Sequence, residues 1–413
     1  MDKRKRASLI LLLGLLSALG PFSIDMYLPG FPAIADDLHT SVDAISYSLS
    51  SFFVGICVGQ LICGPLLDRY GRKRPLYGGL ILYILASIGC ALSSTIEVLV
   101  AFRFLQALGG CVGMVAPRAI VRDVFPVEQN AKVFSLLVLI LGVSPIIAPT
   151  TGSFVIANYG WHTVFVILAV ATTLLLLAII FYLPESKQPN PQYSLRPAPI
   201  LRAFASVLKV PQFYTYAIAG GLVSAALFAY LSGSPFVFMN LYNLSEQQYG
   251  WIFGLIAAGL ITTSQLNNLL LKRFKSEQII RVTILLQALI GLTLVVGTVM
   301  NWFGLIGVIV CIALFLSCQG FSFPNASALS MAPFSKEAGS ASALMGALQM
   351  GLGALASALV GAFNNGTAVP LAATMAGCAV LSWFILMMGR KRIAYQCRQA
   401  DLNEQTLEMI ETY

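Results

Sequence analysis

Long apolar stretches alternate with short polar segments along the whole chain. About twelve of these stretches are close to 20 residues long, the length of an α-helix that crosses a hydrocarbon core of about 30 Å. The pattern therefore predicts an all-α membrane protein with twelve transmembrane helices. We place these spans at residues 8–29, 44–65, 76–95, 98–118, 131–152, 163–183, 213–236, 248–270, 279–299, 304–325, 339–362 and 368–389.

The distribution of charge predicts the orientation. Basic residues fall in alternate polar segments, beginning with residues 3–6, and the intervening segments contain none. Lys and Arg are retained on the cytoplasmic side of a membrane, so both termini are expected to be cytoplasmic. The intervening, outer segments carry acidic residues instead, namely Asp36, Asp37, Asp43, Glu97 and Glu246.

Composition narrows the class of protein further. A chain that is 58% hydrophobic and 10% charged is not an ordinary soluble protein. Its net charge of +8 is explained by membrane topology and by contact with anionic lipid, so we expect a lipid bilayer and no nucleic acid as partners. The eight cysteines show no metal-like spacing with His39 or His162. No cofactor, metal site or disulfide is predicted.

The longest hydrophilic stretch divides the chain into two halves. It is rich in proline and basic side chains and follows the sixth span. Two six-helix bundles with a cavity between them are typical of transporters, although some receptors and membrane enzymes reach a dozen spans. We predict an N-terminal bundle at 1–183, a cytoplasmic linker at 184–212, a C-terminal bundle at 213–389 and a cytoplasmic tail at 390–413.

The loop between the second and third spans carries the most specific motif. Residues 64–74 read Gly-Pro-Leu-Leu-Asp-Arg-Tyr-Gly-Arg-Lys-Arg and match the signature G-x-x-x-D-R-x-G-R-[RK]. The chain thereby resembles the major facilitator superfamily. Topology alone would explain the basic residues but not the acid and the glycines, so we predict an inner gate. Its residues are Gly64, Asp68, Arg69, Gly71, Arg72 and Lys73, with Arg118 and Asp123 at the inner end of the fourth span.

Physical arguments suggest how such a gate works. Gly64 permits close helix contact, and Gly71 allows the chain to reverse. Asp68 can accept hydrogen bonds from the N-terminus of a neighbouring helix. Arg72 can reach a carboxylate, for which Asp123 is the candidate.

Further segments resemble the bicyclomycin-resistance (Bcr/CflA) branch of drug:proton antiporters. Residues 25–29 read Asp-Met-Tyr-Leu-Pro, and residues 103–110 contain an element similar to the R-x-x-Q-G motif of proton-coupled facilitators. Residues 339–349 are also similar to the branch, but the second half has no good copy of the loop motif, so an asymmetric gate is expected. The fifth span resembles a proline-richer antiporter motif, which would bend it and help to seal the cavity, through Gly142, Pro145, Pro149 and Gly152.

Apart from Lys132 and Arg281 at the inner ends of two spans, three charged residues fall inside the predicted spans. Asp25 is the acid, and Arg103 and Arg118 are the bases. Charge at membrane depth is costly and usually has a function. We predict that Asp25 pairs with Arg103 and takes up a proton when the pair is disturbed, while Arg118 serves the inner gate or an inward cavity. The alternatives are an interfacial Asp25 bonded to water, and an Arg103 that is structural or anchors an anionic substrate.

Uncharged side chains predict the substrate pocket. A wall of aromatic rings and amides suits bulky amphipathic molecules that bind by area, stacking and one or two hydrogen bonds. Any one of these aromatic residues could instead face lipid or pack in the core. The candidates are Tyr27, Gln106, Phe228, Tyr230, Phe236, Gln319, Phe323 and Gln349.

These features predict a monomeric, multi-pass exporter of the bacterial inner membrane that moves small amphipathic compounds against entering protons. A symporter or uniporter of a polar metabolite, such as a sugar or an amino acid, is the first alternative. It would favour charged or amide-rich pockets in both halves. A membrane-embedded enzyme is the second alternative, but the sequence contains no cluster of nucleophile and base or of metal ligands.

Overall fold

The protein is all-helical in a computed structural model that describes residues 3–125, 127–190, 197–334 and 338–411. Among these residues no strand occurs, and eleven helices are long and apolar enough to cross a membrane. A further helix, α6 (Val127–Tyr159), covers the fifth predicted span, although several of its side chains lie outside the described set. The predicted all-α membrane fold is therefore confirmed, while the cytoplasmic placement of both termini stays a prediction.

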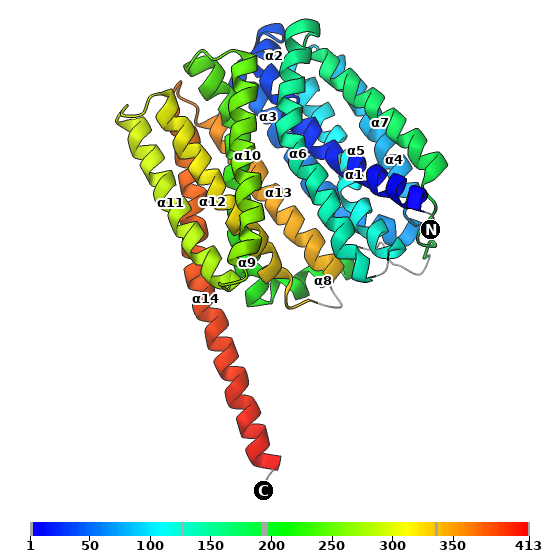
Figure 1. Cartoon of the computed structure of the whole chain (residues 1–413), viewed down its shortest axis with the longest axis vertical. Helices are drawn as coiled ribbons and strands as arrows, with labels where there is room; N and C mark the ends of the chain where they lie inside the picture. Colours follow the sequence, from blue (N-terminus) through cyan, green and yellow to red (C-terminus); the bar gives the residue numbers. More distant parts are fainter. Residues whose placement is uncertain (1–2, 126, 191–196, 335–337, 412–413) are drawn as a thin grey trace.

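The two halves lie side by side, with the first half in blue through cyan to bluish green and the second in green through yellow to red (Figure 1). Besides α6, the first half contains α1 (Lys3–Asp25), η1 (Leu28–Gly30), α2 (Phe31–Asp37), α3 (Val42–Tyr70), α4 (Lys73–Ala91), α5 (Ile96–Val124) and α7 (His162–Tyr182). After α8 (Pro197–Leu208), the second half contains α9 (Pro211–Pro235), η2 (Phe236–Leu241), α10 (Glu246–Leu270), α11 (Ser276–Val299), α12 (Leu305–Met331), α13 (Ala338–Ala362) and α14 (Val369–Glu411).

Three spans start with the same capping arrangement. The hydroxyl of Ser41, Thr95 or Ser245 accepts a hydrogen bond from a backbone N–H in the first turn of α3, α5 or α10, respectively. Each first turn also carries an acid, which the positive end of the helix dipole stabilises. Three of the acids predicted to lie in outer segments therefore also stabilise the starts of these helices, namely Asp43, Glu97 and Glu246.

Most helix ends differ from the predicted boundaries by a few residues, and three of the differences change the course of the chain. The first helix ends at Asp25 rather than at residue 29, because the chain then enters the separate 3₁₀ turn η1, which begins at Leu28, contains Pro29 and leads into α2. The predicted linker contains the amphipathic helix α8, and its residues 191–196 lie outside the described part. The last helix continues past residue 389 to Glu411, so the predicted tail is mostly helical, with 412–413 outside the described residues.

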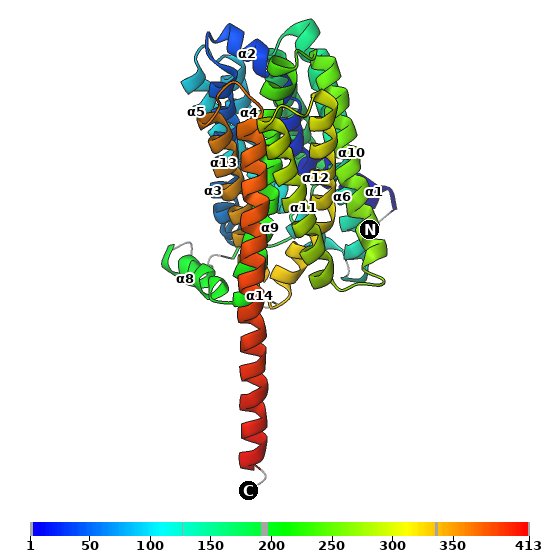
Figure 2. The ribbon, with the colours of Figure 1, turned by 90° about the vertical axis from the view of Figure 1, so that its left-hand side faces the viewer.

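We call the end of the molecule that carries the loop between α3 and α4 the inner end. Helix α8 lies at this end, and the final part of α14 projects from it (Figure 2). The two halves meet where α3 packs against α13 and where α6 packs against α10. These contacts position the candidate site.

Hydrogen bonds between the halves gather toward the opposite, outer end. The hydroxyls of Ser50 and Ser357 lie 2.8 Å apart, and Ser46 donates to the carbonyl of Ser232 at 3.2 Å. Other links join Asn364 to Asp43 and Ser153 to the carbonyl of Glu246. We call these eight residues the outer seal, because they hold the halves together at the end away from the motif loop.

Candidate functional site

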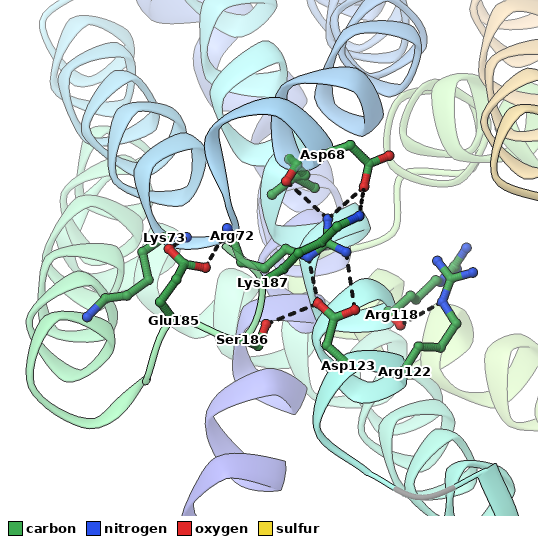
Figure 3. A network of polar contacts seen from close by, with 10 residues as sticks. Asp68, Arg72, Lys73, Arg118, Arg122, Asp123, Glu185, Ser186 and Lys187 are labelled. Carbon is green, nitrogen blue, oxygen red and sulfur yellow. Dashed lines mark hydrogen bonds and ion pairs between the residues drawn. The ribbon is translucent and has the colours of Figure 1, made fainter. Parts of the chain in front are cut away.

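Arg72 lies at the centre of a polar network at the inner end, between the carboxylates of Asp68 and Asp123 (Figure 3). Its Nε donates to Asp123 at 2.7 Å, and its two terminal nitrogens donate to Asp123 and Asp68, each at 3.2 Å. Burial disfavours the charged guanidinium, but the hydrogen bonds and charges of both acids outweigh it, so the pKa of Arg72 lies above its ordinary value. Arg72 and Asp123 are thus in contact, while their role in a gate stays a prediction.

The segment after α7 completes this network and was missed in the sequence. Glu185 accepts hydrogen bonds from the backbone N–H groups of Arg72 and Lys73, at 2.7 and 3.1 Å. Lys187 donates to Asp68 at 2.8 Å, and Ser186 donates to Asp123 at 3.1 Å. The alternation of acid, hydroxyl and base directly after the sixth span was the available signal. The network therefore belongs to the first half and the start of the linker.

The two motif glycines differ in what surrounds them. Gly71 has a φ of +81°, which favours glycine, and a Cβ there would lie 3.0 Å from the Glu185 carboxylate. At Gly64 a Cβ would meet nothing within 4 Å, so the close helix contact expected there is wrong for this structure. Arg69 contributes its carbonyl, which accepts from the N–H of Asn190 at 3.0 Å.

Asp25 and Arg103 do not form the predicted ion pair. Both side chains are buried, but no ion pair involves either of them within the described residues. Because α1 ends at Asp25, this carboxylate lies at the boundary with the second half, whereas Arg103 lies inside the first half. The predicted pairing is therefore corrected.

Arg103 is completely enclosed by aromatic and polar side chains of the first half. Its guanidinium carbon lies 4.2 Å from the ring centre of Phe52 and 4.6 Å from that of Tyr27, which places the charge against two ring faces. One terminal nitrogen donates to Gln106 at 2.6 Å, and Gln106 donates to Ser87 at 2.8 Å. The other two nitrogens have no hydrogen-bond partner in the described structure.

Asp25 lies opposite an aromatic cluster of the second half. The residues of this cluster nearest to it are Tyr230 of α9 and Tyr249 of α10. The Tyr249 hydroxyl is 3.0 Å from that of Ser234, and Tyr230 stacks on Phe253 with ring centres 5.8 Å apart. The acid therefore lies beside the contact between the two halves.

The antiporter-motif residues lie in α6, where the helix contacts both halves. A Cβ at Gly152 would overlap the carbonyl oxygen of Met26, so only glycine allows this approach to the end of α1. A Cβ at Gly142 would lie 3.7 Å from Ile261 of α10, which is ordinary contact. Between these glycines, the helix contains Pro145 and Pro149.

A cavity of about 530 Å³ lies at the inner end. It is bounded by α3 and α5 of the first half, α13 of the second half and α8 of the linker. Its lining includes Asp68 and Arg72 of the motif loop. It also includes Arg118 of the fourth predicted span, so all three residues border the same cavity. We call this space the inner cavity.

The substrate-pocket candidates of the first half and of α9 lie outside the inner cavity. Tyr27 and Gln106 contact Arg103, and the Tyr27 hydroxyl lies 2.7 Å from that of Ser48. Phe228 contacts Phe53 across the two halves, with ring centres 4.4 Å apart. Tyr230 faces Asp25, as described above. These residues form packed contacts between and within the halves.

The remaining candidates are also outside the cavity. Gln319 is buried with its carbonyl oxygen unpartnered in the described structure, and Gln349 is buried on α13. Phe236 begins the π-helical turn η2 and is half-buried. Phe323 is 37% exposed. The structure thus does not bring the eight candidates together in one pocket.

The model of the Major Facilitator Superfamily matches residues 13–358, which is most of the chain. The chain belongs to this superfamily. It is therefore a membrane transporter and not an enzyme. The match spans the motif loop, α6 and both halves, as the motifs predicted.

Relatives along most of the chain agree with the predicted drug-antiporter branch. An uncharacterized MFS-type transporter, YdgK of Bacillus subtilis, is 37% identical over 380 residues, which are 92% of this chain and 94% of the relative. The bicyclomycin resistance protein homolog of Haemophilus influenzae is 30% identical, over 90% of this chain and 94% of the relative. Multidrug resistance protein MdtL of Escherichia coli O81 is 31% identical, over 89% and 92%.

Solved structures share the fold at low identity. A mutant of the nucleoside transporter NupG matches with a TM-score of 0.72 at 15% identity, over 93% of this chain and 99% of the other. A bacterial homolog of the human lysosomal transporter Spinster, in an inward-facing and unoccupied conformation, matches with a TM-score of 0.68 at 16% identity, over 94% and 96%. This similarity confirms the two-bundle transporter fold.

Proposed function

We propose that this transporter exports small amphipathic compounds across the bacterial inner membrane in exchange for protons. The observation that carries the proposal is the difference between the two ends of the molecule. The inner cavity lies between α3, α5 and α13 at one end, while the outer seal joins the halves at the other. A cavity at one end and joined halves at the other are what one state of an alternating-access cycle requires.

In the proposed cycle, the motif loop closes the inner end in the other state. Asp68 lines the cavity from α3, and Gly339 and Ser340 line it from the first turn of α13. Backbone N–H groups at a helix start attract a carboxylate, so closing the cavity would let Asp68 bind the start of α13. The contacts of Asp68 to Arg72 and Lys187 would hold the acid in position before closure.

Asp25 is our candidate for the proton-binding residue. Low dielectric and the absence of a described cationic partner favour its neutral form when the outer seal is closed. Opening the outer seal would admit water to the carboxyl and allow the proton to exchange. Proton binding would thus be tied to the interface with Tyr230 and Tyr249 rather than to Arg103.

Drug susceptibility tests the proposed function. The gene is expressed in a bacterial host that lacks its own exporters, and resistance to a panel of amphipathic antibiotics is measured with and without a proton uncoupler. We expect raised resistance to some compounds that the uncoupler abolishes. Resistance that survives the uncoupler would contradict proton exchange, and energised uptake of a sugar or an amino acid instead of export would favour a symporter.

A further inference from the structure

Two arginines of the inner cavity have no carboxylate partner. Arg118 and Arg122 both line the cavity from α5, and neither forms an ion pair with any residue that the structure describes. Arg122 donates from Nε to the carbonyl of Arg118 at 3.3 Å, and in Figure 3 its guanidinium points away from Asp123. This leaves its terminal nitrogens available for a ligand.

The acid of this cavity is already neutralised. Asp68 is the acid among its described lining residues, and it accepts from Arg72 at 3.2 Å and from Lys187 at 2.8 Å. Two unpaired guanidinium groups on the α5 side therefore give the cavity an excess of positive charge. Guanidinium groups form strong paired hydrogen bonds with sulfonate, carboxylate and phosphate oxygens.

The facing wall adds further donors. Ser340 and Ser342 line the cavity from the first turns of α13, a helix of 25 residues. Hydroxyl groups and the positive end of the helix dipole both favour an anion in the space between α5 and α13. Gln60 of α3 contributes an amide to the same cavity.

The rest of the lining is apolar. Met114 and Val115 line the cavity from α5, and Ile200, Ala203 and Phe204 line it from α8. The volume of about 530 Å³ lies within the range of about 300–1,000 Å³ typical of small-molecule sites. An occupant with an apolar body and one anionic group would match the two kinds of surface at once.

We propose that the inner cavity binds amphipathic anions, whose sulfonate, carboxylate or phosphate group lies on Arg118 and Arg122 and whose apolar body lies against α8. This proposal rests on the proposed export function and narrows its substrate class to compounds that carry negative charge. The ligand-binding role that it gives to Arg118 and Arg122 is separate from the contacts within the motif loop.

Two probes that differ in charge test this site. Purified full-length protein in nanodiscs of zwitterionic lipid is titrated by calorimetry with naphthalene-2-sulfonate and with the neutral naphthalene-2-sulfonamide. We expect the sulfonate to bind about tenfold more tightly, as hydrogen bonds to a charged group imply. Combined Arg118→Gln and Arg122→Gln should lower the sulfonate affinity about tenfold and leave the sulfonamide affinity unchanged.

Matched variants make the result specific. Combined Arg118→Lys and Arg122→Lys should restore part of the sulfonate affinity, because the charge is kept while the planar fork is lost. Arg273→Gln removes an exposed arginine elsewhere at the inner end and should change neither affinity. Equal binding of the two probes by the unmodified protein, or full sulfonate affinity in the glutamine variant, would overturn the proposal.

A lipid arm separates soluble anions from lipid head groups. The sulfonate titration is repeated in nanodiscs that contain phosphatidylglycerol, with the glutamine variant as the reference. Unchanged arginine-dependent binding supports a soluble occupant, whereas its loss would assign the arginines to a lipid phosphate and overturn the substrate class. The titration needs no proton gradient. Arginine-dependent binding of the sulfonate can therefore be observed even if the protein exports no drug, and drug export can be observed even if the sulfonate does not bind.

Discussion

At the scale of single residues, the buried side chains of Asp25 and Arg103 are accommodated in different ways. The cation Arg103 is held by ring faces and by the oxygen of Gln106, with two nitrogens unpaired in the described structure. The acid Asp25 is buried without a described cationic partner and faces the second half. A neutral acid is therefore compatible with the closed outer seal, while Arg103 works as a packed structural cation in this state.

The first prediction concerns Asp25. Asp25→Asn keeps the size of the side chain but cannot bind or release a proton, so ligand-induced proton release from purified protein should disappear while ligand still binds. Release is measured with a pH-sensitive dye in weakly buffered detergent solution. Glu97→Gln, an exposed acid in the first turn of α5, is the matched control and should release normally. Undiminished release from Asp25→Asn would reject the assignment.

The second prediction concerns Gln106. Gln106→Leu removes the one described hydrogen-bond acceptor of the Arg103 side chain and leaves a buried cation without such a bond. We expect a loss of about 2 kcal/mol of stability, seen as a lower melting temperature of the purified protein. Gln106→Glu should restore stability, because its carboxylate can accept the same bond. A melting temperature unchanged in Gln106→Leu would show that the ring contacts alone hold Arg103.

At the scale of elements, α6 connects the end of α1 to α10. Gly152 lies against the carbonyl of Met26, directly after Asp25, and the neighbouring Ser153 donates to the carbonyl of Glu246 at the start of α10. One helix thus contacts both the candidate proton site and the outer seal. This arrangement can couple the position of α1 to the contact between the halves.

The third prediction uses two glycines of this helix. Gly152→Ala would make Cβ overlap the Met26 oxygen and force α6 away from α1, whereas Gly142→Ala would place Cβ at 3.7 Å from Ile261. We expect Gly152→Ala to lose most export activity and Gly142→Ala to keep it. Both are measured as resistance in the exporter-deficient host at matched expression. Equal activity of the two variants would contradict this role of the close approach.

At the scale of the whole molecule, the outer seal and the inner cavity are expected to exchange states. The seal joins α3 to α9 and α13, and the cavity separates the inner ends of α3 and α13. Rocking of the halves about this shared pair would open one end as it closes the other. The helix pair α3–α13 is therefore the proposed pivot.

The fourth prediction concerns a covalent lock on the outer seal. Ser50→Cys combined with Ser357→Cys, in a background without native cysteines, places two thiols where the hydroxyls are 2.8 Å apart. Oxidation should link them, stop export and leave binding from the inner end intact, and a reductant should restore export. Each single variant is the control. Full export by the cross-linked protein, verified by mass spectrometry, would contradict alternating access through this seal.

Much of this protein could be predicted from local sequence. Runs of about 20 apolar residues predicted the spans, because a helix must satisfy its own backbone in lipid. The loop motif indicated the superfamily. A contact between Arg72 and Asp123 could also be predicted, because both residues lie at helix ends near a short turn. Glu185 could have been added on the same grounds, because it directly follows a span that returns to the same end.

Only the tertiary structure decided how distant side chains meet. Asp25 and Arg103 lie at similar expected depths, yet the end of α1 before η1 leaves the acid facing α9 and α10, while Arg103 is enclosed by rings of its own half. The inner cavity depends on how far α13 stands from α3 and on where α8 packs. Hydropathy reports the depth of a residue, but the rotation of each helix and the separation of the halves come from long-range packing, which no local pattern contains.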